Sequence, residues 1–183
     1  CLLLHEDGLL EFDQTLDEFL PDITVPHDSL ITIENLLNMT SGILDYANDG
    51  DMILNEMLED PEHTFTPEEL IDYAIEITNP DDMEPGTFWQ YSNTNYVLLG
   101  LIMEEVTGNT YANLLKTRIL MPFGLSGITV DEEPEQFAHG YLDLDGDDVL
   151  VDISSWNPTP FWSAGCLVGT AKDLGRFARA LFD

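Results

Sequence analysis

Apolar residues along this chain recur mostly at the three- and four-residue spacing of amphipathic helices. The leucine, isoleucine and aromatic positions predict helices at residues 2–10, with a break at Gly8, and at 15–20, 32–39, 95–106, 110–119 and 170–181. A further helix is predicted to begin at Thr66, because threonine can cap it, Pro67 suits its first turn and Glu69 can reach back to the cap. Its core face is expected to carry Leu70, Tyr73, Ala74 and Ile77.

The apolar spacing changes to an alternating one near the C-terminal third. Residues 137–144 and 149–153 alternate like strands around Asp145-Gly146-Asp147, which predicts one hairpin near 137–154. The helical spacing then returns, with one apolar face made of Leu174, Phe177, Ala178 and Leu181. We therefore expect a single unit over residues 1–183 that is mainly α with a small β-hairpin.

The acidic run 143–148 is compared with a calcium loop. Such a loop has glycine at its sixth position and glutamate at its twelfth. Here glycine is fourth and the twelfth residue is Ser154, which favours a solvated turn. The four histidines are far apart in the sequence and lack a second ligand at metal-binding spacing: His5, His27, His63 and His139. No metal and no cofactor is predicted.

Composition limits the possible partners. The chain has 36 acidic and 5 basic residues, for a formal net charge of -31. Nucleic acid is a poor partner, because phosphate binding needs clustered cations and the basic residues are scattered: Lys116, Lys172, Arg118, Arg176 and Arg179. With 44% hydrophobic residues the chain can still bury one core, so a folded protein with an acidic coat is expected. Such a coat suggests a salt-rich source, with an ordinary acidic protein as the alternative.

The longest apolar stretches, the start of the chain and the two cysteines bear on membrane insertion, on completeness and on disulfide bonding. No apolar stretch approaches the roughly 20 residues that cross a bilayer. The chain begins at Cys1 without an initiator methionine or a basic leader, so it is interpreted as a piece of a longer protein. Cys1 and Cys166 could form one disulfide, but two buried thiols are favoured.

The tripeptide Tyr-x-Asn occurs three times and by itself says little. Its copies begin at Tyr46, Tyr91 and Tyr111. Tyr111 lies within a predicted helix, and Tyr46 lies in a polar loop. Only Tyr91 follows a Pro85-Gly86 turn and precedes a long buried helix, which is a rigid mount for a reactive side chain. The bare tripeptide is more often structural than catalytic.

Three longer blocks resemble one family, in its order. They are "ITIENLLNMTSGILDY" (31–46), "PGTFWQYSNTNYVLLGLIMEEVTGNTYANLLKTRILMPFGL" (85–125) and "SAGCLVGTAKDLGRFARALF" (163–182). Together they are similar to the superfamily of serine β-lactamases and penicillin-recognising D,D-peptidases, and most of all to its class C-like group, which includes esterases. "HEDGLLEFDQTLDEFLP" (5–21) resembles the segment after that family's nucleophile helix. The resemblance implies the helical domain of a β-lactamase/transpeptidase-like fold.

The same resemblance implies a mechanism and a pair of site residues. In that family an acyl-enzyme forms on the serine of Ser-x-x-Lys. The lysine and the tyrosine of Tyr-x-Asn manage the proton, and a later Lys-Thr-Gly or His-x-Gly strand helps to form the oxyanion hole. Tyr91 is then the catalytic proton-transfer residue, and Asn93 contacts the lysine or the substrate. Ser92 is expected to be structural. The resemblance also implies a small-molecule or peptidoglycan-like substrate and a periplasmic or extracellular location.

Two family motifs are missing from these residues. Neither Ser-x-x-Lys nor Lys-Thr-Gly or His-Thr-Gly occurs, and the nucleophile is expected just upstream of Cys1. Cys166 stands where the family often has glycine, and Asn38-Met39-Thr40 where it often has His-Thr-Ser; both are interpreted as packing. The chain thus resembles a partial domain with half of a catalytic site, and these 183 residues alone are expected to be inactive.

Three functional hypotheses follow. The first, which we favour, is a fragment of a serine hydrolase that acts on a β-lactam, a D-Ala-D-Ala peptide or an ester. The second is a non-catalytic binding module derived from that fold, which recognises partners through its acidic face. The third is a helical scaffold in which Tyr91 is only a hydrogen-bonded core residue. A Ser-x-x-Lys upstream of Cys1 would favour the first.

The charge generates the first prediction. Because -31 charges lie on a small protein, salt should screen their repulsion and stabilise the folded state. The melting temperature is expected to rise steeply from low salt to molar potassium chloride, as measured by circular dichroism. A melting temperature that does not change over that range would contradict the halophilic interpretation.

Overall fold

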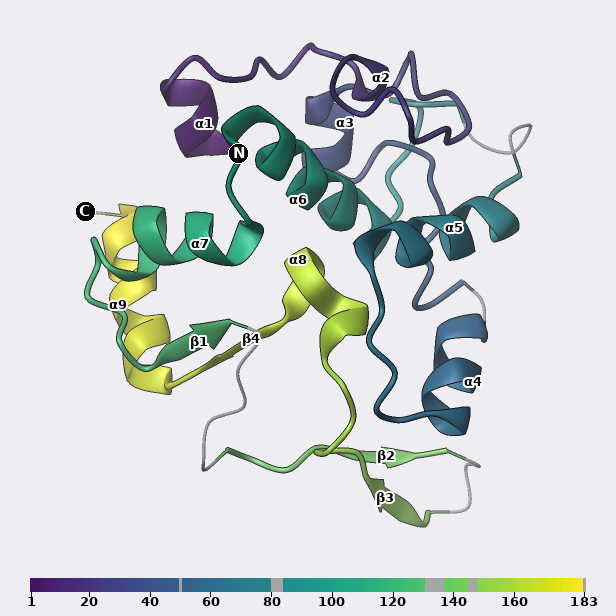
Figure 1. Ribbon diagram of the computed structural model, residues 1–183, viewed down its shortest axis with the longest axis vertical. Helices are drawn as coiled ribbons and strands as arrows, with labels where there is room; N and C mark the ends of the chain where they lie inside the picture. The colour runs from purple at the N-terminus through teal and green to yellow at the C-terminus, as the bar shows by residue number, and fades with distance from the viewer. Residues whose placement is uncertain (50, 80–83, 131–136, 145–147, 183) are drawn as a thin grey trace.

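The protein is mainly helical, as the sequence predicts (Figure 1). The computed structural model describes residues 1–183 apart from 50, 80–83, 131–136, 145–147 and 183. The helices are α1 (Leu2–Glu6), α2 (Leu16–Phe19), α3 (Ile33–Leu37), α4 (Met52–Glu59), α5 (Pro67–Ile77), α6 (Asn93–Thr107), α7 (Tyr111–Leu115), α8 (Trp162–Gly165) and α9 (Ala171–Phe182). A π-helical turn (Lys116–Leu120) follows α7, and a 3-10 turn (Thr159–Phe161) precedes α8.

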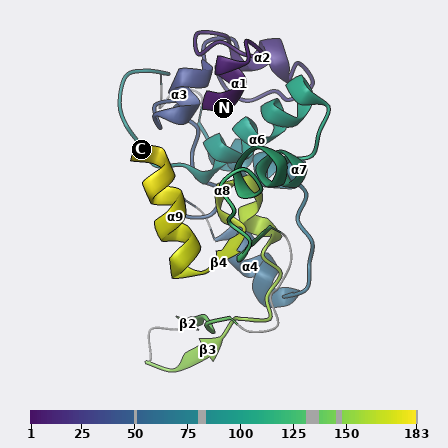
Figure 2. The ribbon, with the colours of Figure 1, turned by 90° about the vertical axis from the view of Figure 1, so that its left-hand side faces the viewer.

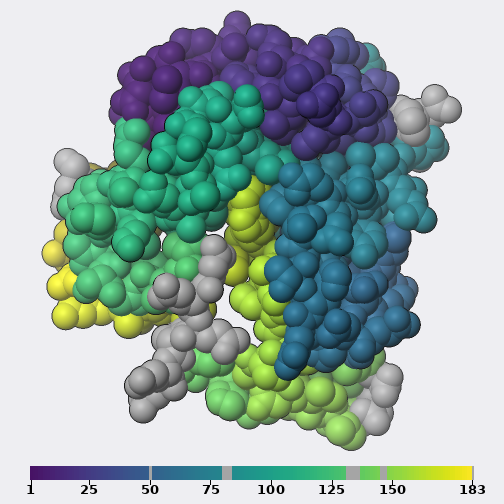
Figure 3. Space-filling model, in the orientation of Figure 1, coloured from purple at the N-terminus to yellow at the C-terminus, as the bar shows by residue number. Residues whose placement is uncertain are grey.

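Helix α6 is the centre of the packing. It contacts α2, α3, α5, α7 and α8, and Figure 1 shows it in the middle of the molecule. Leu98, Leu99 and Ile102 of α6 are almost completely buried, as are Leu70 and Ile71 of α5. In the space-filling view the N-terminal segments cover the upper end, and α8 lies between the segments of α5 and α7 (Figure 3). The core therefore forms around one apolar helix.

Local signals place the ends of the helices where the sequence predicts them or close by. Thr66 accepts a hydrogen bond from the Glu69 backbone amide (3.2 Å), and the Glu69 carboxylate accepts one from the Thr66 amide (2.7 Å). Gly108 ends α6 in the left-handed conformation, with φ at 63°. Helix α6 begins at Asn93, two residues before the predicted start, which makes Asn93 its first residue.

The predicted hairpin is confirmed, and a second strand pair is added. Strands β2 (Tyr141–Asp143) and β3 (Leu150–Asp152) pair antiparallel with Leu142 opposite Val151, and their turn includes residues outside the described ranges. Strands β1 (Ile128–Val130) and β4 (Leu167–Gly169) also pair antiparallel, far apart in the sequence. No turn joins these two strands directly, as one joins the strands of a hairpin, so no local sequence signal predicted this second pair.

One helix was not predicted, and the predicted core face of α5 is confirmed in part. Helix α4, in which Ile53 is the buried residue, has no counterpart in the prediction. In α5, Leu70 and Ala74 are buried as predicted and Tyr73 packs partly buried against the core, whereas Ile77 is only partly covered and the buried Ile71 was not on the predicted face. A periodic pattern locates an apolar stripe but not the neighbours that cover it.

The apolar face predicted for the last helix is largely uncovered. Helix α9 forms as predicted, but Leu174 and Leu181 are 58% and 63% exposed. Figure 2 shows α9 along the outer side of the molecule, with no helix packed beyond it among the described residues. Its apolar face therefore lacks a partner within the part of the chain that the structure describes.

The two cysteines are not joined by a disulfide: Cys166 is buried and Cys1 is partly covered. Within the described ranges, no helix has the length and apolar character needed to cross a bilayer.

The contact between α6 and α8 generates the second prediction. A methyl group added at Gly100 would lie 2.7 Å from the Trp162 ring and would also overlap the Ser163 side chain. Gly100→Ala is therefore expected to destabilise the protein by about 1–3 kcal/mol, although alanine favours helices. The measurement is urea unfolding.

Gly175 in α9 is the matched control. A methyl group there meets no heavy atom within 4 Å. Gly175→Ala should leave stability unchanged or raise it by up to about 1 kcal/mol, because alanine is the better helix former. Equal effects at the two positions would contradict the close packing of α6 on α8.

Candidate active site

Tyr91, Ser92 and Asn93 lie at the start of α6 on a firmly held arm. The arm is anchored by backbone hydrogen bonds from Gly86 to Thr40 (2.8 Å) and from Gln90 to Met39 (2.9 Å). Asn93 is the first residue of the helix. Figure 1 shows this end of α6 between α5 and α8. The arm and the buried helix together fix the tripeptide in place.

The two predicted site residues contact each other. The Tyr91 hydroxyl donates to Asn93 Oδ1 at 2.9 Å. Tyr91 is 49% exposed, whereas Asn93 is 8% exposed. One group thus remains open to an incoming molecule while its hydrogen-bond partner is held inside the protein.

Asp45 is the third member of this cluster, and the sequence reasoning missed it. Asn93 Nδ2 lies 3.1 Å from Asp45 Oδ1 and 3.0 Å from Asp45 Oδ2. Asp45 is only 1% exposed. The sequence holds no distinguishing signal for it, because Asp72 and Asp152 also stand between two apolar residues.

The loop that carries Asp45 is tightly hydrogen-bonded. Asp45 accepts from the Ala47 amide (3.0 Å) and from the Asn48 side chain, and its own amide donates to Asp49 (2.7 Å). No ion pair to Asp45 is found among the described residues. Hydrogen-bond donors therefore satisfy this buried carboxylate without a neighbouring cation from the described ranges.

Serine hydroxyls near the tripeptide serve the fold. Ser92 donates to the Leu44 carbonyl at 3.2 Å, and Ser41 donates to Asn95 Oδ1 at 2.6 Å. Ser92 is fully buried and Ser41 is 2% exposed. Each hydroxyl proton is already donated within the core. The arrangement favours structural roles for both serines and makes neither a good candidate nucleophile.

The other two Tyr-x-Asn copies have different surroundings. Tyr46 is 1% exposed and donates to the Pro160 carbonyl at 2.5 Å, so it is a core residue. Tyr111 begins α7 and packs against the Trp162 ring, with centroids 5.7 Å apart. Tyr46 was expected in a polar loop; the loop is there, but the side chain points into the core. Its Asn48 nevertheless joins Asn93 in binding Asp45.

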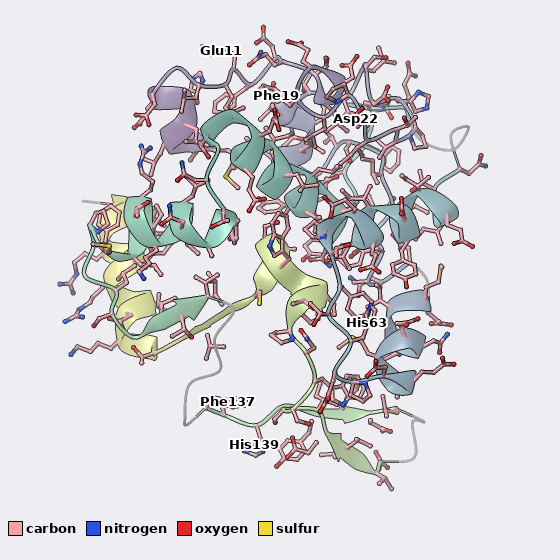
Figure 4. The ribbon with its side chains drawn as sticks, in the orientation of Figure 1. Glu11, Phe19, Asp22, His63, Phe137 and His139 are labelled. Carbon is pink, nitrogen blue, oxygen red and sulfur yellow. The ribbon has the colours of Figure 1, made fainter. Side chains whose placement is uncertain are left out.

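The histidines do not gather at this site. His63 lies between α4 and α5, and His139 lies just before β2 (Figure 4). His139 instead pairs with Asp152 at 2.8 Å. Among the described residues, no three His, Cys, Asp or Glu side chains are grouped closely enough to hold a metal ion. The chemistry of the cluster is that of hydroxyl, amide and carboxylate groups.

Comparison with known proteins gives the class. The family profile described as Beta-lactamase matches residues 1–183. The chain therefore belongs to the beta-lactamase family, within the superfamily of serine β-lactamases and penicillin-recognising proteins. Penicillin-binding protein 4* of Bacillus subtilis is 30% identical over 194 residues, which covers 99% of this chain and 41% of that protein.

Solved structures show the same relationship. A D-stereospecific amidohydrolase from Streptomyces sp. is 34% identical with a TM-score of 0.89, over 98% of this chain and 56% of that one. The D-amino acid amidase from Ochrobactrum anthropi SV3, complexed with L-phenylalanine amide, is 30% identical with a TM-score of 0.80, over 99% and 51% of the two chains. The present chain thus spans about half of these relatives or less.

The buried phenol beside the site generates the third prediction. Burial raises the pKa of Tyr46, and the nearby Asp45 carboxylate and the Tyr91 phenol raise it further. A pKa raised on folding means that the neutral form stabilises the protein below the unfolded-state value of about 10, and that this stability is lost at higher pH. Tyr46→Phe should cost about 1 kcal/mol or more at neutral pH, because it leaves the Pro160 carbonyl unpaired.

The pH dependence is the decisive part of that measurement. The difference in unfolding free energy between wild type and Tyr46→Phe should shrink as the pH rises past about 10, since only the wild type has this phenol to ionise on unfolding. Urea unfolding of both proteins near pH 8 and near pH 11 would measure this difference, because the two pH values lie on either side of the pKa of about 10 of an unfolded tyrosine. A difference that stays constant would contradict the raised pKa.

Proposed function

We propose that the chain forms part of a serine hydrolase that acts through an acyl-enzyme, with Tyr91 as the proton-transfer residue and Asn93 as its amide partner. The observation that carries the proposal is the hydrogen bond from the hydroxyl of the half-exposed Tyr91 to the buried Asn93, at the head of α6 in a member of the beta-lactamase family. A purely structural tyrosine would gain more from a covered hydroxyl, as Tyr46 has.

The proposed reaction needs a serine and a lysine from outside these 183 residues. The serine oxygen bonds to the substrate carbonyl carbon while its proton passes toward Tyr91. When the bond from carbonyl carbon to nitrogen breaks, the proton goes to the departing nitrogen. Water then hydrolyses the acyl ester. The neutral Tyr91 phenol donates its proton to Asn93, so the lysine cation is needed to favour the phenolate that takes up the serine proton.

An amide is the favoured substrate class. The two structural relatives are named as an amidohydrolase and an amidase, and the Bacillus subtilis relative is named for penicillin binding. The amide bond is the common element of an amino acid amide, a peptide and the β-lactam of penicillin. Esters stay possible substrates, because the same acyl-enzyme forms from either kind of carbonyl compound.

The fourth prediction tests Tyr91 in the complete protein that contains this chain. Tyr91→Phe removes only the hydroxyl from a half-exposed ring, so the fold should be retained. Acylation by benzylpenicillin or turnover of D-phenylalanine amide should slow by about 10² to 10⁴, which is the usual contribution of a positioned acid or base. Intact mass against time and ammonia release measure the two rates.

Tyr111→Phe is the matched control, because it removes the same atom from the same tripeptide on a different mount. It should react at the wild-type rate. Tyr46→Phe is unsuitable as a rate control, since its hydroxyl supports the core. Equal rates for Tyr91→Phe and Tyr111→Phe would overturn the catalytic assignment of Tyr91, and a wild-type protein that reacts with neither compound would overturn the proposed hydrolase.

A further inference from the structure

We infer that Asp45 is a positioning residue of the site: it sets the orientation of the Asn93 carboxamide and, through it, the direction in which the Tyr91 hydroxyl points. The inference rests on the proposed function for its effect on catalysis. Its structural part rests on the described contacts alone, which join three side chains in a row from the buried Asp45 to the half-exposed Tyr91.

The chemistry of the groups fixes the orientation of the amide. The two carboxylate oxygens of ionised Asp45 only accept hydrogen bonds, and they lie almost equally far from one atom of Asn93, at 3.1 and 3.0 Å. Only an NH2 group can donate to both. The other end of the carboxamide must then be the carbonyl oxygen, which faces Tyr91 as an acceptor.

This arrangement gives the Tyr91 bond a direction. In the neutral phenol that the structure shows, the Tyr91 hydroxyl donates its proton to Asn93, which leaves the lone pairs of its oxygen available to another group. A phenolate would lose this bond, so ionisation of Tyr91 depends on the cation that is proposed to approach those lone pairs. If the carboxamide turned over, its NH2 would face Tyr91 and occupy those lone pairs. The difference between the two states is a reversal of one hydrogen bond at the atom that is proposed to move the proton.

A turn-forming role alone explains less of what Asp45 contacts. Within the loop, Asp45 accepts from the Ala47 amide at Oδ1 and from the Asn48 side chain at Oδ2. The bonds to Asn93 add a contact that crosses 48 residues of sequence. A carboxylate, which only accepts, can serve all of these donors at once, whereas an asparagine offers one acceptor oxygen. The charge is thus used where an acceptor-only group is required.

The test begins with Asp45→Asn in the complete protein that contains this chain. The new side chain has nearly the same shape, but an NH2 replaces one of the two oxygens that face the Asn93 NH2, so the preference of the Asn93 carboxamide for its present orientation should weaken. The rate of acylation by benzylpenicillin or of turnover of D-phenylalanine amide is expected to fall by on the order of 10², as for other small errors of position. Unfolding in urea would establish that the variant is folded.

A swap restores the direction of the bond. In the double variant Asp45→Asn with Asn93→Asp, the new amide at position 45 donates to the new carboxylate at position 93, which can again accept from Tyr91. The rate should recover at least about tenfold over Asp45→Asn alone, equivalent to 1.36 kcal/mol in activation free energy. A residue that only shapes the turn would give no recovery.

Two variants of the same loop serve as controls. Asp49→Asn removes an equal charge from a residue that bonds Gln90 and the Asp45 amide but not Asn93. Asn48→Ala removes another bond to Asp45 and leaves the Asn93 contact. Both should stay within a few-fold of the wild-type rate, well short of the order of 10² expected for a misplaced group.

The orientation itself has a readout that does not depend on activity. One Asn93 amide proton is shared by the two oxygens of the Asp45 carboxylate, so in amide NMR spectra it should lie downfield and exchange slowly. It should lose both properties in Asp45→Asn. If the Asn93 signals are unchanged in that variant, or if it reacts at the wild-type rate while Tyr91→Phe is slow, the inference fails and the proposed function stands. An unreactive wild type with shifted Asn93 signals would instead overturn the proposed function and leave Asp45 as the residue that orients Asn93.

Discussion

The site depends on one junction, where residues 41–46 are hydrogen-bonded to the first turn of α6. Ser41 bonds Asn95, the Leu44 carbonyl accepts from Thr94 at 2.7 Å, and Asp45 bonds Asn93. These polar groups are buried, so each would cost free energy if it lost its partner. The loop and the helix therefore hold each other in a single arrangement. Tyr91 lies two residues before the first residue of the helix, so this arrangement also fixes its position.

The helix can serve as a mount because it is held along its length. Apolar residues of α6 pack against α3 and α5, and Gly100 allows close contact with α8. The same helix thus organises the core at one end and presents polar groups at the other. A reactive side chain needs to stay within a fraction of an ångström of its working position, which a helix terminus with this much packing can provide.

Patterns that are local in sequence could be predicted, and contacts between distant segments could not. The Thr66 cap, the Gly108 end of α6 and the hairpin depend on neighbouring residues, and each was found where the sequence placed it or close by. Strand pair β1–β4 and the Asp45–Asn93 contact join segments about 40 to 48 residues apart. Nothing in the local spacing of either segment identifies the other. Tyr91 and Asn93 were proposed as site residues through resemblance to a family, which carries information about distant contacts that periodicity lacks.

The charges of the described residues indicate what the other half of the proposed site must bring. Arg118 pairs with Asp7, and Arg176 pairs with Asp173, so these cations are engaged away from Tyr91. The cluster itself consists of a carboxylate, an amide and a phenol: the amide oxygen accepts from Tyr91, and the lone pairs of the half-exposed phenol remain available to another group. Acceptors beside a buried negative charge are complementary to an ammonium group, which would also favour ionisation of a phenol. The proposed lysine would therefore find hydrogen-bond acceptors and a nearby negative charge at this site. Asp45 supplies the charge, and it also turns the Asn93 oxygen toward Tyr91.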